Sequence, residues 1–175
     1  MSALKKLLLT LNASISDREK GVVFLQENPT SFDELFDLVC SVKSTREHIV
    51  AAWVFERFML KRIDSLRPQF DKFLLGAKAQ THESKRRPLA KVLFHYCSNN
   101  RRKAALSEKQ IDTVVSICFA YMIDAKKIAA IGFAMKTLHL FINHQDWIEE
   151  EFRAYIEQKL PNSSAGFRSL VNQFI

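Results

Sequence analysis

Residues 45–52, TREHIVAA, recur in altered form as SKRRPLAK at residues 84–91 and as DAKKIAAI at residues 124–131. Each copy opens with a polar residue that can cap a helix, and these opening residues lie 39 and 40 positions apart. Three positions later stands a basic residue and six positions later an alanine: His48 and Ala51, Arg87 and Ala90, Lys127 and Ala130. Further helix starts follow 20 to 23 residues after each opening, at Ser65, Ser107 and Asp146. A period of about 40 residues with two helices in each period predicts a helical solenoid, in which small residues let helices approach closely.

The rest of the chain also follows the helical period. In residues 111–122, for example, apolar side chains recur every three or four positions, as they do on one face of a helix. No segment alternates steadily between apolar and polar residues, so we expect no strands. Together these patterns predict ten helices, near residues 2–12, 17–27, 32–42, 46–63, 67–78, 85–98, 108–123, 125–143, 147–160 and 164–174.

Several helix starts carry a capping box, in which a serine is followed three residues later by Glu or Gln. Such pairs are Ser16 with Glu19, Ser31 with Glu34, and Ser107 with Gln110. Single N-caps are expected at Thr45, Ser84, Asp124 and Asp146. The apolar run at residues 49–55 predicts a helix that is buried on nearly all sides, Trp53 included.

Residues 46–53 and 126–131 resemble the inner helices of HEAT-like, armadillo-type repeats, which often carry a basic residue shortly before a small residue and an apolar run. The resemblance extends over about residues 16–174. It implies an all-α fold, a right-handed α-α superhelix of about four to five helical hairpins, in a single domain over residues 1–175. The copy at Ser84 departs from the pattern at Pro88, which falls in the first turn, where proline is tolerated.

A second resemblance concerns the C-terminal part. Residues 126–135, followed by LPNSSAGF at residues 160–167, are similar to a group of short all-helical bacterial proteins, some of which are labelled adenylosuccinate lyase. That label implies a lyase-related activity as a remote alternative. Lyases of that superfamily are longer and have a Ser-rich loop with Met, Lys and Asn, whereas no lysine or methionine follows Ser163 and Ser164. The residues themselves predict a turn and the N-cap of the last helix.

The sequence predicts no catalytic, metal or cofactor site. Glycine-rich phosphate loops, the GxSxG pattern, and CxxC or HExxH spacings are absent. Cys97 lies two residues from His95, but nothing suggests a lowered thiol pKa. The three cysteines are odd in number and unclustered, which fits reduced core residues of a cytoplasmic protein. The longest apolar run, residues 128–135, is far shorter than the roughly 20 residues of a membrane span, so we expect no membrane partner.

The charge distribution is the strongest functional feature of the sequence. The formal net charge is +7, and residues 72–103 alone hold nine basic residues against one acid, Glu83. Residues 146–160 hold five acids and two bases. We expect a basic patch, part of it a ladder at the N-termini of the inner helices. Its expected members are Arg46, Lys85, Arg86, Arg87, Lys91, Arg101, Arg102, Lys103, Lys126 and Lys127.

Three interpretations of this patch stay open. The first is a non-enzymatic scaffold that binds a protein partner, an acidic one, through its basic face. The second is nucleic-acid (DNA) binding on a basic concave surface, as in HEAT-like DNA-repair proteins, whose catalytic residues have no counterpart here. The third is a solvated face without a ligand. The apolar ends, residues 7–11 and 174–175, would also suit a homodimer, so the oligomeric state stays open.

Overall fold

The computed structural model describes residues 1–174, and over that range it consists of helices and the turns between them. The ten helices expected from the sequence are all present, and no strand occurs in this range. The short α7, inside the basic loop after α6, is a helix that the sequence pattern did not predict. The α-helices are α1 (Ala3–Thr10), α2 (Ile15–Glu27), α3 (Ser31–Cys40), α4 (Arg46–Lys61), α5 (Phe70–Lys78), α6 (Glu83–Cys97), α7 (Asn100–Ala104), α8 (Glu108–Asp124), α9 (Ile128–His139), α10 (Asp146–Lys159) and α11 (Ala165–Val171), with 3-10 helices η1 (Ile63–Gln69) and η2 (Leu160–Asn162).

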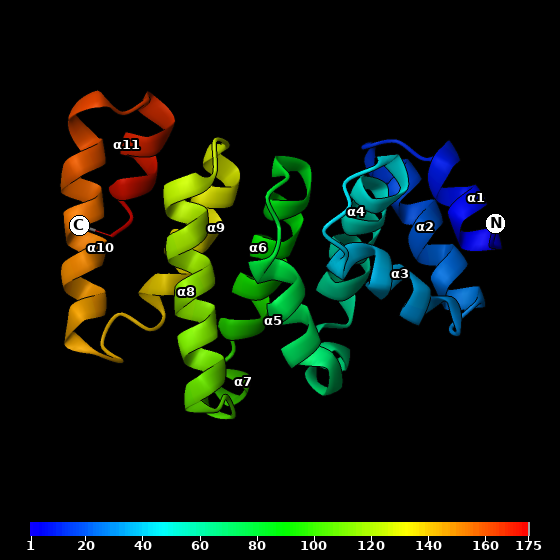
Figure 1. Cartoon of the computed structure of the whole chain (residues 1–175), viewed down its shortest axis with the longest axis horizontal. Coiled ribbons are helices and arrows are strands. Elements are labelled where there is room, and N and C mark those ends of the chain that lie inside the picture. Colours follow the sequence, from blue (N-terminus) through cyan, green and yellow to red (C-terminus); the bar gives the residue numbers. More distant parts are fainter. Residues whose placement is uncertain (175) are drawn as a thin grey trace.

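The helices form hairpins that stack side by side, with the two termini at opposite ends of the stack (Figure 1). The pairs are α1–α2, α3–α4, α5–α6, α8–α9 and α10–α11. The second helices α2, α4, α6 and α9 pack on one another in sequence order, and the first helices α3, α5 and α8 form the other layer. The architecture is an α-α superhelix of helical hairpins, as the sequence predicts.

Small residues bring the helices of each layer together. The recurrent Ala51, Ala90 and Ala130 are at most 2% exposed, each in a second-layer helix. Glycine acts in the same way between α3 and α5, where a Cβ at Gly76 would lie 2.7 Å from the Sγ of Cys40 and 2.9 Å from its Cα. These contacts join the hairpins around one cluster of buried side chains that runs through the stack.

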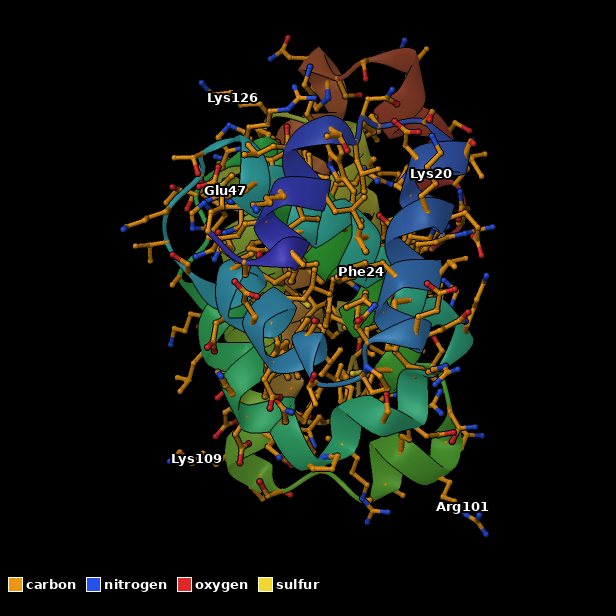
Figure 2. All side chains as sticks on the ribbon, turned by 90° about the vertical axis from the view of Figure 1, so that its right-hand side faces the viewer. Lys20, Phe24, Glu47, Arg101, Lys109 and Lys126 are labelled. Atoms are coloured by element: carbon orange, nitrogen blue, oxygen red, sulfur yellow. The ribbon has the colours of Figure 1, made fainter. Side chains whose placement is uncertain are left out.

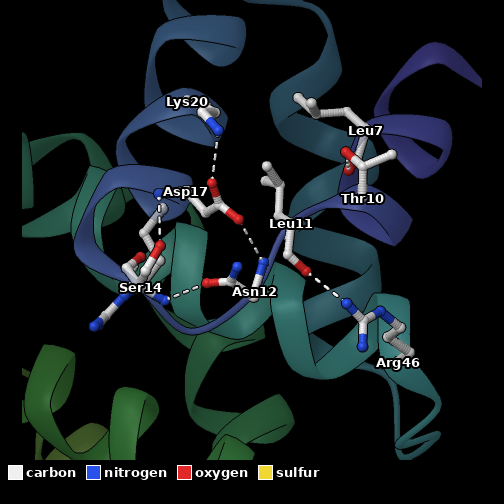
Figure 3. A network of polar contacts seen from close by, with 9 residues as sticks. Leu7, Thr10, Leu11, Asn12, Ser14, Asp17, Lys20 and Arg46 are labelled. Atoms are coloured by element: carbon white, nitrogen blue, oxygen red, sulfur yellow. Dashed lines mark hydrogen bonds and ion pairs between the residues drawn. The ribbon is translucent and has the colours of Figure 1, made fainter.

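The last carbonyl groups of several helices accept hydrogen bonds from side chains elsewhere in the chain. No residue among 1–174 has a positive φ, so none of these helices ends in the left-handed turn that commonly satisfies the last carbonyls. Side chains from the following hairpin bind those carbonyls instead. Arg46 donates to the carbonyl of Leu11 after α1 (2.9 Å, Figure 3). The hydroxyl of Tyr121 donates to the carbonyl of Ala77 in α5 (2.7 Å).

The same arrangement continues at α3 and α8. Beyond α3, the carbonyl of Ser41 accepts from Nε2 of Gln80 (3.0 Å) and from Nζ of Lys85 (2.5 Å). In the last turn of α8, the carbonyl of Met122 accepts from the hydroxyl of Tyr155 (2.6 Å). Each of these donors comes from the next hairpin along the chain or from the segment that leads into it.

Capping boxes were predicted at three helix starts, and one of them forms. Ser107 and Gln110 bind each other's backbone N–H as expected. The prediction at Ser16 was wrong: the N-cap of α2 is Ser14, because Asp17 donates its N–H to the Ser14 hydroxyl (3.1 Å). The Asp17 carboxylate also accepts from the N–H of Asn12 in the preceding loop (3.0 Å, Figure 3). The prediction at Ser31 was also wrong, because α3 starts after Thr30.

The single N-caps were predicted less well than the helices themselves. Thr45 does precede α4, although its hydroxyl bonds to the ring of His48 instead of the backbone (2.6 Å). The N-caps predicted at Ser84, Asp124 and Asp146 were wrong, because the residues that cap these helices are His82, Lys127 and Gln145. Asp124 is the last residue of α8. The repeat therefore varies in length more than the sequence pattern indicated.

We predict that Gly76→Ala lowers the free energy of unfolding by about 1–3 kcal/mol, because the new methyl meets the backbone of α3 and the helices must separate. Urea unfolding measures the change. The matched control is Gly166→Ala, whose Cβ would meet its nearest neighbours, in Ser164 and Ile128, only at 3.8 and 3.9 Å. The control should be neutral or slightly stabilising. Equal effects of the two substitutions would contradict the close approach of α3 and α5.

We also predict that Tyr121→Phe destabilises the fold by about 1–2 kcal/mol, because the carbonyl of Ala77 loses its buried donor. Tyr96→Phe is the control: this ring is also buried, but its hydroxyl makes no hydrogen bond to any residue described here. That control should change stability by less than about 0.5 kcal/mol. Thermal or urea unfolding of both variants decides, and a Tyr121→Phe protein as stable as the control would refute capping by the next hairpin.

Candidate binding surfaces

Two of the residues expected in the basic patch are buried. Lys85 is fully buried, and its Nζ donates to the carbonyls of Ser41 (2.5 Å) and Lys43 (3.0 Å). Burial lowers the pKa of Lys85 to about 8. Arg86 is 6% exposed, donates to the carbonyl of Gln80 (2.9 Å), and lies over the ring of Tyr121. Neither side chain presents its charge to solvent.

Three other expected members bind carbonyls at helix ends. Arg46 donates to the carbonyls of Leu9 and Leu11. Arg102 donates to the carbonyls of Tyr96 (2.9 Å) and His95 (3.1 Å) and pairs with Asp64 (2.7 Å). Lys103 donates to the carbonyl of Leu140 in the next hairpin (3.1 Å). The positive charges of Arg46 and Lys103 have no acidic partner in the described chain, but their donors are already engaged.

Arg87 and Lys91 form a clamp on a buried carboxylate. Glu56 of α4 is 3% exposed, and it accepts from Arg87 (2.8 Å) and Lys91 (3.0 Å), which stand one turn apart on α6. A second clamp of the same kind joins α2 and α4, where the carboxylate of Glu19 binds Arg57 and Lys61. These two clamps tie successive second-layer helices together. Hydrogen bonds from Lys61 and then Arg57 lower the pKa of Glu19.

The remaining expected members are exposed at two separate places. Arg101, Lys126 and Lys127 have exposed side chains for which the described chain offers no ion-pair partner. Figure 2 looks along the stack and places Lys126 near the top and Arg101 at the bottom, that is, at opposite ends of the helices. The structure therefore does not bring all of the expected residues together on one surface.

At the upper end, a groove of about 260 Å³ collects basic side chains from three places in the chain. We call it the Trp53 groove; it is lined by Ala13, Arg18, Trp53, Glu83, Ser84, Arg87 and Lys127. Arg18 comes from α2, Arg87 from α6, and Lys127 precedes α9, so the expected ladder is present in part. Trp53, expected to be buried, is half-exposed and donates its Nε1–H to the carbonyl of Ser84 (3.2 Å).

The sequence patterns missed Arg18 and the exposure of Trp53. Arg18 lies outside the three recurring segments, and nothing in its neighbourhood marks it as a member of the ladder. Trp53 lies within an apolar run, which hides the fact that one edge of the indole reaches the surface. An indole N–H needs an acceptor, and that requirement was the available signal that Trp53 meets a free carbonyl, which is that of Ser84 in the first turn of α6.

At the lower end, Arg101 and Arg102 line a larger cavity of about 800 Å³ between η1 and α7. Arg67 of η1 and Tyr96 of α6 line it as well, and neither was singled out from the sequence. We call it the Arg101 pocket. It lies at the opposite end of the helices from the Trp53 groove, as the positions of Arg101 and Lys126 in Figure 2 illustrate.

The groups that could serve catalysis are in unfavourable settings. Cys97 is buried, and burial raises its pKa to about 12, so the thiol is not activated by His95. Among residues 1–174 no group of three His, Cys, Asp or Glu side chains could hold a metal ion. In the C-terminal loop, Ser164 caps α11 by accepting from the N–H of Phe167 (3.2 Å), which is the turn and N-cap that the sequence predicts. In the described chain no helix combines the length and apolar character of a membrane span.

Comparison with known families identifies the fold. Residues 6–175 match the model of the HEAT repeat domain, and the chain belongs to this family. HEAT repeats are helical scaffolds that often take part in protein interactions. No curated protein and no solved structure matches the chain.

The buried position of Lys85 leads to a prediction about pH. Between about pH 8 and pH 10.5 the folded protein loses this proton while the unfolded chain keeps it, so the unfolded state binds more protons and stability rises with pH. The stability of the protein relative to Lys85→Met should therefore increase by about 1–2 kcal/mol from about pH 7 to about pH 9.5. Urea unfolding at both pH values measures this difference, with Lys109→Met, at an exposed lysine of α8, as control. A difference that stays flat or falls with pH would contradict the burial of a charged Lys85.

Proposed function

We propose that this chain is a non-enzymatic binding module that holds an acidic segment of a partner protein in the Trp53 groove. The observation that carries the proposal is the gathering of Arg18, Arg87 and Lys127 around the half-exposed Trp53. Aromatic side chains in partly desolvated positions dominate many protein interfaces, and surrounding charges set the choice of partner. A short segment with acidic residues and one apolar side chain complements this arrangement.

The basic side chains of the Trp53 groove differ in how far their charges are already paired within the protein. Arg87 shares the carboxylate of Glu56 with Lys91, so its charge is largely compensated. Glu83 accepts from the backbone N–H of Lys127 (3.1 Å) and lies 3.5 Å from Arg86, which leaves the Lys127 ammonium itself without an acidic partner in the described chain. Arg18 makes one long bond to a carbonyl in its own helix (3.4 Å). Arg18 and Lys127 are therefore the cations that a partner would meet.

Nucleic-acid binding is the alternative. A duplex would require phosphate contacts along an extended positive surface. The separation of Arg101 from Lys126 and the internal engagement of Lys85, Arg86 and Arg102 favour a compact acidic ligand over a duplex. We therefore place the nucleic acids in the same experiment as competing probes.

The experiment is fluorescence anisotropy with three labelled probes: a peptide rich in Asp and Glu that carries one Phe, a DNA duplex and a DNA single strand. At about 50 mM salt we expect the peptide to bind most tightly, and to weaken several-fold at about 200 mM salt. The pair of substitutions Arg18→Glu and Lys127→Glu should weaken the peptide by at least about tenfold.

The pair Lys78→Glu and Lys109→Glu provides the matched control, since it makes the same change of charge on α5 and α8, outside the Trp53 groove. It should leave peptide affinity within about twofold of the unchanged protein. Peptide binding that tolerates the Arg18 and Lys127 reversals would contradict the proposal. Tighter binding of the duplex, with a steep loss in salt, would establish the alternative instead.

A further inference from the structure

The Arg101 pocket has the size and shape of a small-molecule site. Its volume of about 800 Å³ lies within the range of roughly 300–1,000 Å³ that is typical of ligand pockets. Five elements surround it: η1, the start of α5, the end of α6, α7, and the start of α8. Its lining consists of Asp64, Arg67, Phe70, Tyr96, Asn99, Arg101, Arg102, Ala105, Leu106 and Gln110.

The pocket carries an excess of positive charge. Its acid, Asp64, pairs with Arg102 (2.7 Å), whose other donors hold two helix-end carbonyls. Arg67 and Arg101 are exposed, and within residues 1–174 neither has an acidic partner. Two residues of the lining therefore carry a positive charge without compensation. Guanidinium groups bind planar or tetrahedral oxyanions through paired N–H donors.

The back of the pocket holds a polar group without a partner. Tyr96 is 3% exposed and its ring stacks on Phe70 with centroids 4.1 Å apart. The hydroxyl of Tyr96 has no hydrogen bond to any residue in the described range, and this oxygen keeps some exposure to solvent at the cavity wall. Burial raises the pKa of Tyr96, while the charge of Arg67 is the strongest influence that opposes the rise. The phenol therefore stays protonated as a donor, and Arg67 lies close enough to act on it.

These groups select the chemistry of a ligand. Arg67, Arg101 and Tyr96 can donate hydrogen bonds, and the acid of the pocket is already paired. A donor-rich site with two uncompensated positive charges favours a dianion with several acceptor oxygens. Ala105 and Leu106 supply an apolar wall beside it. The cavity is larger than a lone oxyanion requires, so room remains for an organic group.

We propose that the Arg101 pocket binds a small phosphate monoester, with its phosphoryl oxygens on Arg67, Arg101 and the Tyr96 hydroxyl and its organic group against Leu106. This function is separate from the Trp53 groove, which lies at the other end of the helices. Neither site supplies residues to the other.

Isothermal titration with phenyl phosphate tests the proposal at about pH 7.5, where the monoester is a dianion. We expect saturable binding with a Kd below about 1 mM, at least about fivefold tighter than inorganic phosphate, which lacks the apolar group. Benzoate, with one charge, and succinate, with two charges on separate carbons, should bind at least about tenfold more weakly than phenyl phosphate.

Substitutions in the lining locate the binding site. Arg67→Gln and Arg101→Gln should each raise the Kd of phenyl phosphate at least about tenfold, and an unchanged circular dichroism spectrum would show that the fold persists. Tyr96→Phe should weaken binding about three- to tenfold without lowering stability, since no protein bond is lost. Lys126→Gln is the matched control, because Lys126 lies at the opposite end of the helices from Arg101, and it should leave the Kd of phenyl phosphate unchanged.

The proposal would be overturned by the absence of saturable binding of phenyl phosphate up to about 10 mM. Binding that survives both arginine substitutions would also overturn it. Succinate or inorganic phosphate binding as tightly as phenyl phosphate would likewise reject a monoester site.

Discussion

Every helix leaves carbonyl groups at its last turn without a partner, and at the ends of α1, α3, α5 and α8 a partner comes from the next hairpin. A buried carbonyl that loses its donor costs about 1–3 kcal/mol. Arg46, Lys85, Tyr121 and Tyr155 each reach back to the end of an earlier first-layer helix. The donors differ in chemistry, but their task is the same. Stability therefore depends on contacts between neighbouring hairpins, as expected for a solenoid.

This requirement explains why the basic residues of the chain do not form one surface. A long cationic side chain is well suited to reach a carbonyl across a hairpin boundary, because its apolar stem packs while its head donates. Lys85 and Lys103 are used in this way, while Arg86 and Arg102 bind carbonyls that lie six or seven residues away. The net charge of +7 thus overstates the charge that is free for a partner. Of the residues expected in the patch, the exposed Lys127 lies beside Trp53, and the exposed Arg101 lies at the other end of the helices.

Local patterns predict the helices and the repeat well, because both are recorded in short stretches of sequence. The buried Ala51, Ala90 and Ala130 and the capping box at Ser107 are examples. The N-caps fail where neighbouring polar residues compete, as Ser14 does with Ser16.

The fate of a charged side chain is harder to predict. The amine of Lys85 binds carbonyls that are 42 and 44 residues away, and no local pattern records that distance. The same holds for Arg18 and Lys127, which line one groove only because four hairpins stack on one another. Their positions become evident only from the packed structure.

Lysine acylation of the folded protein, mapped by mass spectrometry, tests the central claim most directly. Only the unprotonated form of a lysine amine reacts with an acylating reagent. A lysine with a pKa of about 8 would therefore react fastest if solvent could reach it. We expect Lys126 and Lys127 to be modified in the native protein, while Lys85 is modified only after unfolding. Native Lys85 reacting as fast as Lys126 would contradict the account, because the basic residues would then not be the caps that join one hairpin to the next.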